Sequence, residues 1–196
     1  MYGDSFNMAC IEPCSHIYGP GLRFVVWVQG CSLCCPGCWN QGMWPTKPNT
    51  IIHRNDLLKK IEHQKGLTGV TILGGEPLEQ AENTLWLLRE AQKSGLDTML
   101  YTGYEMEEIN ACPIKSRALM HADILVSGRY DEKRRNIFLK WRGSENQTIQ
   151  CLSPRYTAQD FQDQNDVEIH IDPDGSLTVV GYPTPGLIKS LNPNIS

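Results

Sequence analysis

The chain alternates between short apolar runs and amphipathic segments with helical spacing. Segments with apolar residues three or four positions apart predict a helix that begins at Asn55 or Asp56, a helix over 79–93 and a helical turn over 105–111. Strands that alternate with helices over short breaks are typical of βαβ units on a parallel sheet. The apolar, β-branched and aromatic runs predict four such strands, at residues 22–28, 70–73, 97–101 and 123–126.

The last third of the chain follows a different pattern. Residues 129–150 are polar and irregular and include the basic run 133–135, so we expect a solvated surface loop. Two alternating segments, 167–171 and 177–180, flank the turn sequence Asp-Pro-Asp-Gly and predict a β-hairpin. This hairpin need not belong to the parallel sheet.

Length and composition indicate one globular unit. A chain of 196 residues suits one domain with an appendage. We therefore expect a core domain over 1–150 and a C-terminal extension over 151–196 within the same compact unit. Hydrophobic residues make up 40% and charged residues 20% of the chain, which is ordinary for a globular protein.

Charge and hydropathy exclude two classes of partner. The net charge is −4, so the basic footprint of a nucleic-acid binder and the polybasic patch of a membrane binder are absent. No apolar run approaches the roughly 20 residues that span a bilayer. The first residues also lack the cationic start and apolar stretch of a signal peptide. We expect a cytoplasmic protein with no nucleic-acid or membrane partner.

Eight cysteines are the most unusual feature of the composition, and four of them fall within residues 31–38. In a reducing cytosol such crowding indicates metal ligation rather than a disulfide framework. Two cysteines before the first predicted strand, Cys10 and Cys14, are expected to be buried free thiols rather than ligands of a second cluster. Cys112 and Cys151 are solitary, and we expect them to be buried.

Two ligand sets compete within the cluster. Cys-x2-Cys pairs at Cys31/Cys34 and Cys35/Cys38 would make a four-cysteine zinc site, but such pairs usually lie a dozen or more residues apart. The alternative is Cys31-x3-Cys35-x2-Cys38, with Cys34 as a bystander. Three thiolates on one tight loop can hold an iron–sulfur cluster and leave the fourth iron open to a substrate.

A glycine-rich turn follows the second predicted strand. Gly74-Gly75-Glu76-Pro77 leaves room for a ligand against the backbone and supplies an acceptor in Glu76. By itself the motif is more typical of a turn between a strand and a helix. Because the cysteines and this turn follow consecutive strands, at the edge where α/β folds place their sites, a binding role is favoured.

Together these motifs resemble the radical S-adenosylmethionine (radical SAM) superfamily, and within it the small proteins that activate anaerobic ribonucleotide reductase. The resemblance covers roughly residues 19–150. Further motifs stand in family order: Gly19-Pro20-Gly21, the block from Gly30 to Asn40, Tyr101-Thr102-Gly103-Tyr104 and Trp141-Arg142-Gly143-Ser144-x-Asn146-Gln147. Ser127 stands where these activating proteins usually have aspartate.

The resemblance implies cofactors and ligands. Cys31, Cys35 and Cys38 would bind a 4Fe–4S cluster, whose open iron would chelate the amino and carboxylate groups of S-adenosylmethionine. It places Gly37 and Trp39 near the adenine, and it implies further cofactor contacts from Gly74, Gly75, Glu76 and Thr102. No residue is assigned a catalytic role.

The resemblance also implies a fold and an activity. A complete eight-stranded barrel takes about 250 residues, and this chain offers four clear strands and at most two more before the hairpin, so we expect a partial, laterally open (βα) barrel. The cluster would reductively cleave S-adenosylmethionine to a 5′-deoxyadenosyl radical that abstracts hydrogen from a glycine of a glycyl-radical enzyme. Flavodoxin or ferredoxin would donate the electron.

Two other functions compete with this one. The first is a small-molecule or peptide-modifying radical enzyme, similar to a carboxy-deazaguanine synthase. The second is an iron–sulfur electron carrier that never cleaves the cofactor. The Gly74-Gly75-Glu76-Pro77 turn argues against a carrier, which has no use for an aminoacyl-binding turn.

Overall fold

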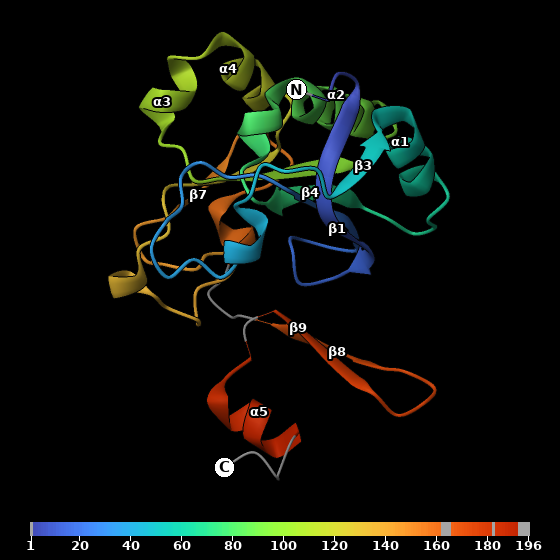
Figure 1. Cartoon of the computed structure of the whole chain (residues 1–196), viewed down its shortest axis with the longest axis vertical. Coiled ribbons are helices and arrows are strands. Elements are labelled where there is room, and N and C mark those ends of the chain that lie inside the picture. The colour runs from blue at the N-terminus through green and yellow to red at the C-terminus, as the bar shows by residue number, and fades with distance from the viewer. Residues whose placement is uncertain (1, 162–165, 182, 192–196) are drawn as a thin grey trace.

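A seven-stranded sheet forms the centre of the computed structural model, which describes residues 2–161, 166–181 and 183–191 (Figure 1). Its spatial order is β3-β1-β2-β4-β5-β6-β7. The strands are β1 Ser5–Ser15, β2 Arg23–Val28, β3 Thr50–His53, β4 Gly69–Gly74, β5 Asp97–Thr102, β6 Ile124–Ser127 and β7 Thr148–Cys151.

The middle of the sheet is parallel. Strands β2, β4, β5 and β6 are successive parallel neighbours, and they coincide with the four predicted strands to within one residue at each end. All six residues of β2 are buried, as expected for a parallel strand that is covered on both faces. The prediction of βαβ units on a parallel block is confirmed.

The outer strands are antiparallel, so the sheet as a whole is mixed and the expectation of a purely parallel sheet is wrong. Strand β1 pairs with β2 on one side and β3 on the other, and β7 pairs with β6. Sequence patterns missed β1 because bulges between Met8 and Cys10 and between Glu12 and Ser15 interrupt its alternation. Strands β3 and β7 have four residues each and no buried side chain, so their hydrophobic signal is weak.

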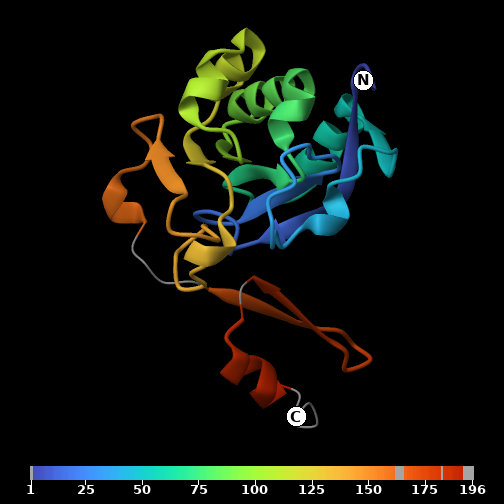
Figure 2. The same ribbon diagram turned by 60° about the vertical axis from the view of Figure 1, so that its left-hand side comes forward.

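The two faces of the parallel strands are covered differently. Alternate residues face a helical layer, as the period of two requires, and pack there with side chains of α1–α4. The opposite face contacts loops instead of helices, with Val25, Trp27, Leu73, Met99 and Val126 buried there. Figure 2 shows the helices gathered on one side of the sheet.

The helical layer consists of α1 Arg54–Glu62, α2 Ala81–Lys93, α3 Met106–Asn110 and α4 Pro113–Leu119. Helix α1 begins before the predicted Asn55 or Asp56, because the His53 ring accepts a hydrogen bond from the Asn55 N–H and caps the helix. The predicted helix over 79–93 is a 3-10 turn, Pro77–Gln80, followed by α2. None of the described helices is long and apolar enough to cross a membrane.

Residues 129–147 pack against the loop-covered face of the sheet, so the expectation of a solvated loop is wrong for part of this segment. Trp141 and Ser144 are buried, and Trp141 packs beside Met99 and Val126. Its charged residues 132–135, which include the short 3-10 turn Glu132–Arg134, are exposed. The polar residues of this segment led to the expectation of a solvated loop, although the buried Trp141 side chain anchors the segment to the sheet.

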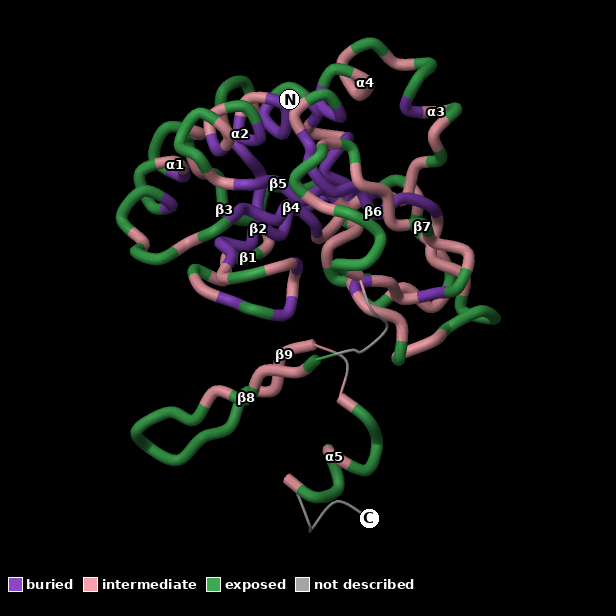
Figure 3. Tube along the Cα trace, turned by 180° about the vertical axis from the view of Figure 1, so that it is seen from behind, coloured by how far each residue is buried: buried purple, intermediate pink, exposed green. Residues whose placement is uncertain are grey.

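The C-terminal region forms a separate two-stranded antiparallel sheet, β8 Val167–Ile171 and β9 Leu177–Gly181, followed by α5 Pro185–Leu191. No described residue of these three elements is buried (Figure 3). The Glu168 carboxylate accepts hydrogen bonds from the Ser15 hydroxyl at 2.6 Å and from the His16 N–H at 2.7 Å. The division of the chain at residue 150 remains a prediction.

A buried ion pair crosses the parallel block. Arg23 is completely buried, and its guanidinium lies 2.5 Å from the Asp97 carboxylate. The same guanidinium donates to the Thr71 hydroxyl and the Val70 carbonyl of the intervening strand β4. Tyr156 donates its hydroxyl to Asp97 at 2.8 Å, so the segment after β7 contacts the same pair. These bonds satisfy a charge that would otherwise be costly to bury.

Candidate functional site

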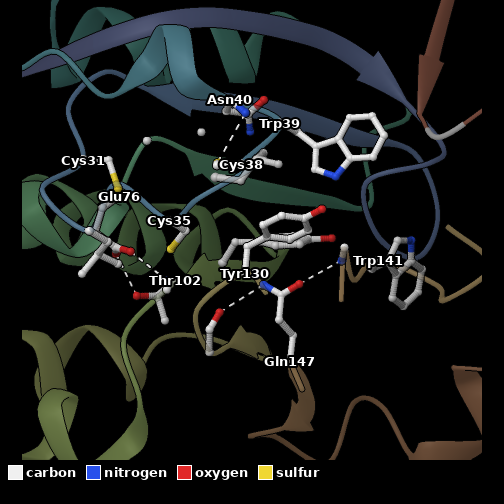
Figure 4. A pocket seen from close by; sticks show the side chains of 18 residues that line it. Cys31, Cys35, Cys38, Trp39, Asn40, Glu76, Thr102, Tyr130, Trp141 and Gln147 are labelled. Atoms are coloured by element: carbon white, nitrogen blue, oxygen red, sulfur yellow. Dashed lines mark hydrogen bonds between the residues drawn. The ribbon is translucent and has the colours of Figure 1, made fainter. Parts of the chain in front are cut away.

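The cysteine-bearing loop begins where β2 ends. Gly30 turns the chain with a φ of 104°, and its N–H bonds the Met43 carbonyl at 2.8 Å. The Cys31 N–H bonds the Trp44 carbonyl at 3.0 Å. The loop from 31 to 44 is therefore closed at its base and stands over the carboxyl ends of β4 and β5 (Figure 4).

A pocket with about 770 Å³ of empty space, including that at its open mouth, lies beneath this loop. The lining combines the loop with the ends of β4, β5 and β6 and with the segment after β6. Its residues are Cys31, Leu33, Cys35, Cys38, Trp39, Asn40, Leu73, Gly74, Gly75, Glu76, Tyr101, Thr102, Gly103, Gly128, Tyr130, Trp141, Gly143 and Gln147.

The pocket separates the four clustered cysteines. Cys31, Cys35 and Cys38 line it, whereas Cys34 is exposed and does not. Cys34 adopts a φ of 44°, unusual for a residue with a Cβ, and its thiol bonds the Cys31 carbonyl at 3.3 Å. The turn at Cys34 directs its side chain away from the three others. This arrangement favours the three-cysteine ligand set over the four-cysteine one.

The spread of the thiols suits a group larger than one ion. Among the described residues, no three cysteine, histidine, aspartate or glutamate side chains gather closely enough to hold a single metal ion. Zinc requires its ligands about 2.3 Å away at tetrahedral corners. A three-thiolate set around one cavity is the donor set of an iron–sulfur cluster, in which each cysteine binds its own iron. The residues present fit such a cluster.

Burial controls the protonation of two of these thiols. It raises the pKa of Cys31 to about 11, although N–H groups of Leu33 and Cys34 act in the opposite direction. It also raises the pKa of Cys35, against the effect of the Tyr130 N–H. Both are therefore neutral thiols at neutral pH until a metal displaces the proton.

Glu76 lies at the floor of the pocket and is 1% exposed. Its carboxylate accepts three hydrogen bonds of 2.8 Å, from the Leu78 N–H, the Thr102 hydroxyl and the Gly103 N–H. Burial raises its pKa to about 7, and these three donors limit the rise. Glu76 therefore ties the turn after β4 to the turn after β5.

The two glycines before Glu76 allow a close backbone approach. A Cβ at Gly74 would meet the backbone of Trp27 and Val28, and Gly74 has a φ of 115°. A Cβ at Gly75 would meet the Gly30 carbonyl, to which the Glu76 N–H donates at 2.8 Å. The turn thus supports the start of the cysteine loop as well as lining the pocket.

The structure separates two residues that the resemblance places together. Trp39 lines the pocket mouth and is 45% exposed, and the Arg135 guanidinium lies 4.1 Å from the centre of its ring. Gly37 does not line the pocket. It adopts a φ of 70°, and a Cβ there would meet the carboxylate of Glu132.

Sequence reasoning assigned no site role to several side chains that line the pocket, among them Tyr130, Trp141 and Gln147. Gln147 accepts hydrogen bonds from the Gly143 and Ser144 N–H groups and donates to the Gly128 carbonyl. It therefore fixes the strand end of β6 against the covering segment. The sequence could have indicated two of them, because Trp141 and Gln147 are the first and last residues of the last motif of the resemblance.

Thiol ligands do not gather elsewhere in the described chain. Cys10 is exposed and Cys14 is half-buried, so the expectation that both are buried is wrong. Both lie on β1, whose pairing with β2 is interrupted by bulges between Met8 and Cys10 and between Glu12 and Ser15. Cys112 and Cys151 are also only half-buried, which corrects the expectation of burial.

Comparisons with known proteins identify relatives of this chain. The family described as a 4Fe-4S single cluster domain matches residues 17–150. An anaerobic ribonucleoside-triphosphate reductase-activating protein of Enterobacteria phage T4 is 32% identical, over 73% of this chain and 92% of the phage protein. A protein of that name from Escherichia coli K12 is 30% identical, over 71% and 95% respectively. The crystal structure of QueE from Escherichia coli aligns with a TM-score of 0.40 and 20% identity, covering 50% of this chain and 52% of QueE.

Proposed function

Since the chain belongs to the 4Fe-4S single cluster domain family, we propose that it is a radical SAM protein that activates an anaerobic ribonucleotide reductase by creating a glycyl radical in it. The observation that carries the proposal is the division of the cysteines. Cys31, Cys35 and Cys38 share a pocket with the Gly74–Glu76 turn, and Cys34 is excluded from it. Relatives that match over almost their whole length carry the name of reductase-activating proteins.

In this proposal the three cysteines hold a 4Fe–4S cluster, and S-adenosylmethionine binds beside it. When bound, the pair supplies one-electron cleavage of the sulfonium bond and hence a 5′-deoxyadenosyl radical that removes hydrogen from the target glycine. Flavodoxin or ferredoxin is the proposed electron source. The chain itself binds, orients and excludes water.

The role of the turn after β4 follows from its hydrogen bonds. Glu76 already accepts from Leu78, Thr102 and Gly103, so its carboxylate fixes the two strand ends at a constant separation. We assign the amino group of S-adenosylmethionine to the pocket face of Gly74, Gly75 and Glu76. Thr102 acts there by holding Glu76 in place.

The aromatic side chains provide the opposite wall. Trp39 offers a flat surface at the pocket mouth, which suits the adenine ring. Gly37 contributes by letting the loop turn against Glu132 rather than by lining the pocket. Tyr130 and Trp141 close the side formed by the segment after β6 and limit access of water.

Access by a protein substrate follows from the shape of the sheet. Only four strands run parallel, and antiparallel strands flank them on both sides. We propose that this arrangement is a shortened (βα) barrel that stays open laterally. A loop of another protein can then approach the pocket, whereas a closed barrel would admit only small molecules.

The test follows the hydrogen atom. Reconstituted protein, reduced with dithionite and mixed with the reductase, is expected to cleave S-adenosylmethionine and give the reductase a carbon-centred doublet in electron spin resonance. Deuterium placed on the target glycine is expected in 5′-deoxyadenosine. Transfer from a purine precursor, with no protein radical, would support the small-molecule alternative. A bound cluster without any cleavage would support the electron carrier.

A further inference from the structure

The segment after β6 carries a disproportionate share of the positive charge. Residues 129–146 contain six of the 18 basic residues of the chain but only three of its 22 acidic residues. The rest of this acidic protein is therefore more negative than its net charge of −4 indicates. The exposed cations of residues 129–146 lie at 133–135, and of these Arg134 also pairs with Asp131. They give this part of the surface a positive local field, opposite in sign to the net charge of the molecule.

This positive segment lies directly against the cysteine-bearing loop. The Glu132 carboxylate packs at Gly37, and Arg135 stacks over Trp39 at the pocket mouth. Arg135 also pairs with Ser144 as an isolated β-bridge, and the Asn136 N–H bonds the carbonyl of the pocket residue Gly143 at 3.2 Å. Residues 135–136 and 143–144 are thus the paired ends of a loop that closes beside the pocket.

The loop between these paired ends presents an exposed aromatic ring. Phe138 is 68% exposed, and Lys133 and Arg134 precede it on the exposed face. Interfaces favour aromatic and arginine side chains at their energetic centres. Phe138 is absent from the hydrophobic clusters that the described residues form in the core, and the buried anchor of this segment is Trp141.

We infer that Trp39, Lys133, Arg134, Arg135 and Phe138 form a docking surface for an acidic segment of the protein substrate, next to the glycine that enters the pocket. The inference rests on the proposed function and deepens it by naming the chemistry of the partner. Cations at the rim accelerate the encounter with an acidic chain, and Phe138 supplies apolar contact once it is bound. Arg135 links the surface to the pocket because it touches Trp39.

A nucleic acid is the other polymer that a basic and aromatic surface can take. Binding of a single-stranded nucleic acid needs a positively charged groove that follows the backbone over several nucleotides. Here the basic run is three residues long, Asp131 and Glu132 precede it, and the chain as a whole has a net charge of −4. A short acidic stretch of a polypeptide fits such a run better than a continuous phosphate backbone does. The geometry therefore favours the acidic polypeptide, and the nucleic acid becomes an outcome of the test.

The first experiment measures binding without chemistry. A fluorescein-labelled 20-residue peptide rich in aspartate and glutamate is titrated with the full-length protein, and a 20-nucleotide single-stranded DNA serves as competitor. Peptide binding that weakens at least tenfold in the Lys133→Glu/Arg134→Glu variant, and also weakens with added salt, is the expected result. Unchanged peptide binding, or complete competition by DNA at equal concentration, would overturn the inference.

The second experiment uses the reductase as substrate. The Lys133→Glu/Arg134→Glu and Phe138→Ser variants are expected to raise KM for the reductase about tenfold with kcat nearly unchanged, since the residues act on docking. Cleavage of S-adenosylmethionine without the reductase is expected to stay at the wild-type rate. Matched controls are Lys60→Glu/Lys65→Glu on the exposed helix side and Met120→Ser, whose side chain is 78% exposed.

The two experiments separate the two claims. If the wild-type protein forms no glycyl radical, the proposed function fails, and the peptide titration still decides the docking surface. If the radical forms but the control variants raise KM as much as the docking variants, the surface is not specific and the inference fails. Thermal unfolding of each variant, followed by circular dichroism, checks that the fold is intact.

Discussion

Two regions of the molecule differ in burial. One is the part of the sheet around the cysteine loop, and the other is the C-terminal hairpin. Strands β2, β4, β5 and β6 are buried almost throughout and converge on one pocket. Strands β8 and β9 contain no buried residue; Glu168 accepts hydrogen bonds from Ser15 and His16, and Gly181 lies beside Ile17. The match to the 4Fe-4S single cluster domain family also ends at residue 150, before the hairpin. The pocket and most of the buried residues therefore belong to the first region.

The sharpest contrast is expected from the cysteines. Cys31→Ala, Cys35→Ala and Cys38→Ala are each expected to abolish cluster assembly, because three thiolates are needed to hold the cluster. Cys34→Ala is the matched control and is expected to keep about four iron and four sulfide per chain after anaerobic reconstitution. Iron and sulfide assays measure the result. Loss in Cys34→Ala together with retention in Cys35→Ala would contradict the ligand assignment.

The buried ion pair is expected to give the next largest effect. Arg23→Met leaves Asp97 buried without its cation, and such a change typically costs about 3–5 kcal/mol in free energy of unfolding. Urea denaturation of the cluster-free protein, followed by circular dichroism, measures it. Arg89→Met on the exposed side of α2 is the control and is expected to change stability by less than about 0.5 kcal/mol. Equal losses would mean that Asp97 does not depend on Arg23.

Glu76 is expected to make the stability of this region depend on pH. Burial raises its pKa in the folded state from 4.5 to about 7, so the folded chain holds the proton more tightly than the unfolded chain does. Stability is therefore expected to fall by about 3 kcal/mol as pH rises from about 4.5 to about 7, and then to level off. The free energy of unfolding is measured against pH for the wild type and for Glu76→Gln, and the difference between the two isolates the contribution of Glu76. If the free energy of unfolding of the two proteins changed in parallel with pH, the prediction would be wrong.

The hairpin is expected to give the smallest effect on the core. Glu168→Ala removes the bonds to Ser15 and His16, so amide exchange in β8 and β9 is expected to accelerate. The unfolding midpoint of the core is expected to stay within the error of measurement. Deleting residues 166–196 is likewise expected to leave cluster content intact. Loss of iron in this deletion would show that the two regions depend on each other.

Sequence patterns predicted the strands of the first region well, because continuous apolar runs are a local feature that recurs at each of these strands. Continuous apolar runs identified the four parallel strands, and spacing distinguished Cys35 from Cys34. Patterns failed where contacts between distant residues decide the structure. The bulged strand β1 is stabilised by two partners that no local period reveals, and Trp141 anchors a segment that otherwise resembles a solvated loop.

The same limit explains what was missed at the site. Gly75 was expected to leave room for a ligand, and the structure shows that it also leaves room for the Gly30 carbonyl. A bulky side chain there would disturb the cysteine loop itself, so such a variant cannot separate ligand binding from loop geometry. Thr102→Val is the better probe, since it removes one bond to Glu76 and leaves both glycines in place.

The strand order has a consequence for synthesis on the ribosome. Each new strand joins the sheet beside a strand that has already left the exit tunnel. Strand β3 adds to the free side of β1, and β4, β5, β6 and β7 add one after another on the side of β2. The cysteine loop emerges directly after β2, whereas Glu76, Thr102 and Gln147 emerge later and in that order. A nascent chain paused before β6 would therefore expose its three thiols to a cluster-delivery machinery while one wall of the pocket is still unmade.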